Sequence, residues 1–264
     1  MMDSMESLAE LRERREFECR LTPSRALASL DEAEDFLRDR GMLTRTADCA
    51  VPSLYEACHE ESYQPGGKGF ASWPATKWPW FSLLGDRGHP IVMVHRGKNL
   101  LVSADAARLL DPICRAEIER MRASDQGSRR LLDHLAQAGP SNTEDLCTEL
   151  NLNRQELKAL RAPLERCGAI VSYSPLMTRE EHGHPTELAR WDQVHPSAAG
   201  EVDPMSAFGD LITAAVRSAV VAPEREVGRW FSWPWYWTAT LIDDLARAGR
   251  LRRVNAHVTG LQAR

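Results

Sequence analysis

The segment 90–103 carries side chains whose types and spacing point to chemistry. Arg96 and Lys98 flank Gly97, and Asn99 follows, between the apolar runs 91–94 and 100–102. Two such runs around a Gly-containing turn predict a β-hairpin with a turn over 96–99. Cations at a hairpin tip could contact the phosphates of a nucleic acid. The alternative is an ordinary charged turn, in which the preceding His95 is also solvated.

A second group of cations lies near the C-terminus. Arg250, Arg252 and Arg253 belong to the stretch 245–264, which contains no acidic residue. The net charge of −5 argues against a protein that coats nucleic acid generically. A local basic face could still bind DNA, so we consider these arginines candidate DNA contacts, with an ordinary solvated face as the alternative.

Tryptophans gather in two similar stretches, at 73–80 and 233–237. Large aromatic side chains commonly pack where structural units meet, and we expect this of most of them. Trp78 and Trp80 are the exceptions that we consider for a pocket, where they could stack on an extruded base or a small aromatic ligand.

The composition is that of an ordinary soluble globular protein. Of 264 residues, 43% are hydrophobic and 27% are charged. No apolar run is long enough to span a membrane, so no membrane partner is expected. The six cysteines include no Cys-x-x-Cys pair, which favours a reduced, cytoplasmic protein with buried thiols. We therefore expect no metal site and no cofactor.

Repeated helix ends predict how these residues are positioned. Leu164–Gly168 and Leu245–Gly249 are similar, and Arg38–Gly41 is a weaker third copy; each predicts a helix end, a glycine cap and the start of a strand. We expect helix breaks at Pro112 and Pro163. The predicted fold is mainly α with small β wings, in three tandem winged-helix modules. The predicted boundaries are an N-terminal arm (1–22), modules at 23–122, 123–177 and 204–264, and a linker or crossing segment (178–203).

Two stretches carry a resemblance to a known family. Val92–Asp105 resembles the segment of AlkZ-type bacterial DNA glycosylases that reads Arg-Gly-Thr-x-His-Leu-Val before a helix. Leu43–Thr46, followed by Pro52–His59, resembles the catalytic stretch of that family, and Arg129–Tyr173 resembles its central module. Together with their YcaQ-type relatives, these are tandem winged-helix enzymes. The resemblance implies DNA repair by hydrolysis of the N-glycosidic bond of alkylated or crosslinked purines.

The resemblance also identifies candidate catalytic residues. The family positions its attacking water with Gln-x-Gln or Gln-x-Asp, and the matching positions here are Thr44 and Thr46. A threonine hydroxyl can orient water but is no base near neutral pH. The His of the family pattern is replaced by a leucine. Nearby Asp48 and His95 are further polar candidates.

Two hypotheses follow from these residues. The first is a DNA-associated protein that recognises or excises modified bases, with Arg45 in the family-like stretch as an additional DNA contact. If it is an enzyme, it is a metal-independent N-glycosidic hydrolase. The second is a catalytically inactive relative that acts as a transcriptional regulator or binds a small molecule in a tryptophan-lined pocket.

Overall fold

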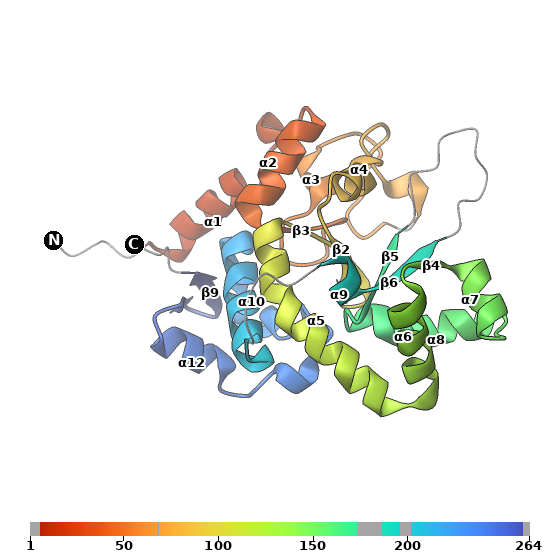
Figure 1. The fold of residues 1–264 in the computed structure, drawn as a ribbon. Coiled ribbons are helices and arrows are strands. Elements are labelled where there is room, and N and C mark those ends of the chain that lie inside the picture. Colours follow the sequence, from red (N-terminus) through yellow and green to blue (C-terminus); the bar gives the residue numbers. More distant parts are fainter. Residues whose placement is uncertain (1–5, 68, 174–185, 196–201, 261–264) are drawn as a thin grey trace.

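The computed structural model describes residues 6–67, 69–173, 186–195 and 202–260. Three units with the same order of elements make up most of it, and each has a three-stranded antiparallel sheet (Figure 1). In each unit the last strand lies in the middle of the sheet, because it pairs with both the first strand and its hairpin neighbour. This is the helix–strand–helix–helix–strand–strand order expected of a winged-helix module.

The first unit holds the hairpin. Its elements are α2 (Leu30–Arg40), β1 (Met42–Thr44), α3 (Leu54–Ala57), α4 (Trp80–Asp86), β2 (Ile91–His95) and β3 (Lys98–Val102). The turn is shorter than predicted: Arg96 and Gly97 alone form it, both with positive φ, and His95 pairs with Lys98. Lys98 and Asn99 belong to β3, so their side chains follow the alternation of a strand.

The second and third units repeat this order. The second comprises α6 (Gln126–Ala138), β4 (Ser141–Asn142), α7 (Thr143–Glu149), α8 (Arg154–Arg166), β5 (Ile170–Tyr173) and β6 (Glu187–Arg190). The third comprises α10 (Pro204–Ala219), β7 (Val221–Pro223), α11 (Glu224–Val227), α12 (Leu241–Arg247), β8 (Leu251–Val254) and β9 (His257–Gly260). Outside the three units lie α1 (Leu8–Glu18), the 3-10 helix η1 (Pro23–Arg25), α5 (Ala104–Ser124) and α9 (Trp191–Val194). Two further 3-10 helices lie within units: η2 (Phe70–Ser72) between α3 and α4, and η3 (Pro234–Tyr236) between α11 and α12.

Several predicted details of the chain path are wrong. Residues 187–194, expected in a linker, form the central strand β6 and the helix α9, while the rest of that segment lies mostly outside the described residues. The helices α5 and α8 continue through Pro112 and Pro163, because packing holds them in place. The boundaries between modules stay a prediction.

The repeated glycine is present in all three units, but in the first unit it is a different glycine from the one predicted. Gly168 and Gly249 end the third helix of their units, before β5 and β8. Gly41 ends the first helix of its unit, before β1, so it is not their counterpart; that position belongs to Gly88, between α4 and β2. All four have positive φ, the conformation that glycine adopts without strain.

The first sheet is buried on both faces. Along β3, Leu100 and Val102 belong to the large core shared by all three units, whereas Leu101 belongs to a smaller core with α2, α3 and α4. The long helix α5 follows β3 and packs against α6 and α10, which joins the units. The hairpin is therefore an internal element and not a wing that projects freely. No helix in the described part of the chain could cross a membrane.

Candidate functional site

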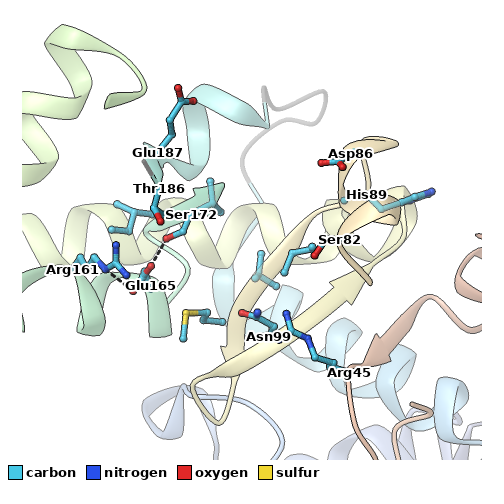
Figure 2. A pocket seen from close by; sticks show the side chains of 16 residues that line it. Arg45, Ser82, Asp86, His89, Asn99, Arg161, Glu165, Ser172, Thr186 and Glu187 are labelled. Atoms are coloured by element: carbon cyan, nitrogen blue, oxygen red, sulfur yellow. Dashed lines mark hydrogen bonds and ion pairs between the residues drawn. The ribbon is translucent and has the colours of Figure 1, made fainter. Parts of the chain in front are cut away.

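A cavity of about 580 Å³ lies where the first and second units meet (Figure 2). Its walls come from α4 and the hairpin on one side and from α8, β5 and β6 on the other. That volume is in the range of small-molecule and cofactor sites. The polar side chains of its wall are Arg45, Ser82, Asp86, His89, Asn99, Arg161, Glu165, Ser172, Thr186 and Glu187.

Arg45 is the least satisfied of these polar groups. Its guanidinium carbon lies 5.2 Å from the ring centroid of Trp73 and 4.7 Å from that of Phe81. Burial lowers the pKa of Arg45 from its usual value, although an arginine remains charged near neutral pH. Its Nε is buried with no hydrogen-bond partner among the described residues. A buried cationic donor without a partner is costly.

The opposite wall carries a fixed acidic group. Glu165 on α8 accepts a hydrogen bond from Ser172 on β5, and Nε of Arg161 lies 3.6 Å from its carboxylate. At the far rim, His89 contacts Glu34 at 2.9 Å. The hydrogen bond to His89 and a second one to Arg87 lower the pKa of Glu34 to about 2. The cavity wall thus carries both hydrogen-bond donors and acceptors.

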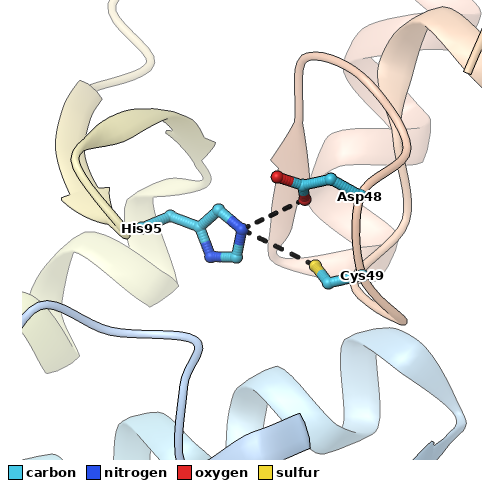
Figure 3. A group of neighbouring side chains, drawn as sticks. All are labelled: Asp48, Cys49 and His95. Carbon is cyan, nitrogen blue, oxygen red and sulfur yellow. Dashed lines mark hydrogen bonds and ion pairs between the residues drawn. The ribbon is translucent and has the colours of Figure 1, made fainter. Parts of the chain in front are cut away.

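A second polar cluster joins the loop after β1 to the end of β2 (Figure 3). Nε2 of His95 lies 3.3 Å from Oδ1 of Asp48 and 3.6 Å from Sγ of Cys49. Lys98 donates to the other oxygen of Asp48 at 2.5 Å. His95 is buried, not solvated as a hairpin residue would be. Asp48, Cys49 and His95 each offer one ligand atom, and these atoms all lie within 4.8 Å of one another, a spacing that a metal ion could use.

The charge states in this cluster follow from its surroundings. Burial alone would raise the pKa of Asp48, but hydrogen bonds from His95 and Lys98 hold it well below its usual value. Burial, with the negative charge of Asp48, raises the pKa of the Cys49 thiol to about 12. Near neutral pH the carboxylate is therefore ionised and the thiol is neutral. Neither Asp48 nor His95 lines the cavity described above.

The other predicted catalytic positions are less available. Thr44 is the last residue of β1, is buried, and donates its hydroxyl hydrogen to the carbonyl of Pro52. Thr46 is half-buried in the loop that follows. Neither Trp78 nor Trp80 lines this cavity. Trp80 is partly buried and packs against the smaller core of the first unit. Trp78 is exposed and meets the exposed Phe70 edge to face.

The predicted DNA contacts are largely engaged within the chain. Nε of Arg96 donates to the carbonyl of Arg229 at 3.1 Å, in the third unit. Arg250 pairs with Asp210, and Arg252 donates to the carbonyl of Glu6. Arg253 pairs with two carboxylates. Only tertiary structure brings these acidic partners next to the C-terminal arginines, which look unpaired in the sequence.

Sequence reasoning missed Cys49, Arg161 and Glu165. Cys49 lacks any metal-binding spacing in the sequence, because its neighbours in space come from a hairpin 46 residues further along. Arg161 and Glu165 have ordinary i, i+4 spacing on a helix, which is typical of a solvated pair. The sequence contains no signal that distinguishes this pair from a surface pair.

One of the comparisons with known proteins finds a similar fold. No protein-family model and no curated protein matches the sequence. Among solved structures, the chain is similar to the DNA glycosylase AlkZ of Streptomyces sahachiroi, with a TM-score of 0.57 and 15% sequence identity. The match covers 96% of this chain and 70% of that one. The resemblance predicted from the hairpin and the stretch after α2 is therefore confirmed for the fold: this chain is folded like the DNA glycosylase AlkZ.

Proposed function

We propose that this protein is DNA-associated and recognises a modified base, which it holds outside the duplex in the cavity between the first and second units. The proposal rests on the cavity of about 580 Å³, whose wall includes the half-buried, cationic side chain of Arg45. A base turned out of a duplex is read by hydrogen bonds along its edge. Arg45 and Asn99 offer donors, and Glu165 offers an acceptor on the facing wall. The AlkZ-like fold supports the choice of DNA.

Catalysis by the mechanism of the resembling family is not part of this proposal. Thr44 already donates its hydroxyl hydrogen to Pro52, and Asp48 and His95 lie outside the cavity wall. Recognition thus has better support than excision. Incubation with alkylated DNA followed by alkaline cleavage measures excision directly, and strand breaks above a no-protein control would add a hydrolase activity to the proposal.

Paired duplexes test the proposed recognition. Fluorescence anisotropy compares a duplex that contains one alkylated purine with the same duplex unmodified, over a series of salt concentrations. We expect tighter binding of the modified duplex, and an affinity that falls with salt because phosphate contacts release counterions. Equal affinity for the two duplexes, or no binding at low salt, would refute the proposal.

A small-molecule ligand is the second candidate. It is favoured by the internal ion pairs of Lys98, Arg250 and Arg253, which reduce the positive charge available to a phosphate backbone. Free purine nucleosides in the same titration separate the two candidates. Binding of a free nucleoside without binding of either duplex would support the small-molecule function.

A further inference from the structure

We propose that Asp48, Cys49 and His95 form a binding site for a zinc-type divalent cation, in which the chain supplies one oxygen, one sulfur and one nitrogen ligand. Zinc takes this mixture of donors in tetrahedral sites, at bond lengths of about 2.0–2.3 Å. It binds cysteine as the thiolate, so the proton of the Cys49 thiol is released to solvent when the ion binds. The site lies apart from the cavity, so this inference does not depend on the proposed function.

Two of the three separations between the ligand atoms match a tetrahedron. From those bond lengths, a nitrogen and an oxygen that share a zinc ion lie about 3.3 Å apart, and a nitrogen and a sulfur about 3.6 Å apart. The observed distances from Nε2 of His95 are 3.3 Å to Asp48 and 3.6 Å to Cys49. The third separation, between the thiol and the carboxylate, is at most 4.8 Å. Rotation about one Cα–Cβ bond can shorten it.

The loop that carries two of the ligands is held on both sides of them. The amide of Ala47 donates to the hydroxyl of Tyr63 at 2.8 Å. The amide of Ala50 donates to Glu226 at 2.6 Å, and its carbonyl accepts from Arg15 at 3.0 Å. These anchors come from α1, the first unit and the third unit, so the ligands need little rearrangement to bind a cation.

The hairpin holds the third ligand in a similar way. The carbonyl of Val94 accepts a hydrogen bond from the amide of Ser232 at 2.9 Å, and Nε of Arg96 donates one to the carbonyl of Arg229. His95, between these two anchors, is 1% exposed and points Nε2 at the other two ligands. A bound cation would thus tie the loop after β1 to the end of β2.

One position of the tetrahedron is left for solvent. Lys98 holds the second oxygen of Asp48, which leaves the first oxygen for the cation and orients the carboxylate. The Lys98 side chain is 58% exposed, so the cluster faces water on this side. Three chain ligands and one water are the coordination expected here.

Cobalt titration of the full-length, metal-depleted protein under reducing conditions tests the site. A thiolate bound to tetrahedral cobalt gives a near-ultraviolet charge-transfer band and intense visible absorption. We expect both at one cobalt per chain, with displacement by zinc. Cys49→Ser should abolish the charge-transfer band and lower zinc affinity by at least about 10-fold, since even a residue that only supports a metal ligand contributes this much. Cys147→Ser, at a half-buried cysteine on α7, is the matched control and should keep the band.

Two results would overturn the proposal. One is the absence of a charge-transfer band in the wild-type protein with cobalt in excess. The other is a band that persists in Cys49→Ser. Asp48→Asn keeps the thiol and removes the anionic ligand, so it should retain a band while zinc affinity falls; unchanged zinc affinity in this variant would also contradict the site. The wild-type titration decides the question even where a variant does not fold.

Discussion

Replacement of Arg45 by methionine separates ligand recognition from folding. Methionine keeps an unbranched apolar stem against Trp73 and Phe81 but removes the charge and the unpartnered Nε. A hydrogen bond from a charged donor contributes about 1.5–3 kcal/mol. Affinity for the modified duplex should therefore fall about 10- to 150-fold.

Stability should respond much less than affinity. Contacts of a cation with aromatic rings contribute about 0.5–1 kcal/mol at exposed sites and about 2 kcal/mol when desolvated. Arg45→Met loses such contacts with Trp73 and Phe81. Removal of a half-buried charge has the opposite effect, because burial penalises the charged form, as the lowered pKa of Arg45 indicates. We expect the free energy of unfolding to change by about 1 kcal/mol or less, because the two effects offset each other.

Anisotropy titrations of both duplexes, with urea unfolding of the same samples, measure the two quantities. Arg247→Met is the matched control, since Arg247 is an exposed arginine on α12. It should leave the preference for the modified duplex unchanged. Wild-type affinity in Arg45→Met would refute the assignment of the cavity as the base site. An equal loss in both variants would show a general charge effect instead.

Three further predictions concern the hairpin, the core and pH. Arg96→Ala combined with Lys98→Ala should weaken duplex binding less than Arg45→Met does, because both side chains already have partners within the chain. A larger loss of duplex affinity in the anisotropy titration would show that the hairpin tip contacts DNA. Glu117→Ala should lower the free energy of unfolding, measured in urea, by about 3 kcal/mol, because this buried carboxylate accepts hydrogen bonds from an arginine and two aromatic side chains. A loss below about 1 kcal/mol would contradict a stabilising role for this carboxylate. The pKa of Glu34 is lowered from 4.5 to about 2, mainly by its hydrogen bond to His89. The ionised carboxylate therefore stabilises the fold above pH 4.5, and this contribution is lost as pH falls towards 2. Glu34→Gln should flatten this part of the stability–pH curve, and an unchanged curve would count against the contact.

The sequence by itself determined the elements and their repetition. Glycines at 168 and 249 required a left-handed backbone at helix ends, and strands follow both. Such signals are local: a cap or a turn depends on a few neighbouring residues, so it can be identified without the rest of the chain. The hairpin was predictable for the same reason, and the continuous apolar runs on both of its strands are typical of a strand that is buried on two faces.

Tertiary structure alone decided what the polar residues do. Arg96 and Lys98 look like a free basic tip in the sequence, yet their partners come from the third unit and from the loop after β1. Asp48 and Cys49 meet His95 only in the folded chain, because they lie 47 and 46 residues away from it in the sequence. Charge neutralisation, burial and ligand geometry depend on contacts between residues far apart in the chain, and no local pattern encodes those contacts.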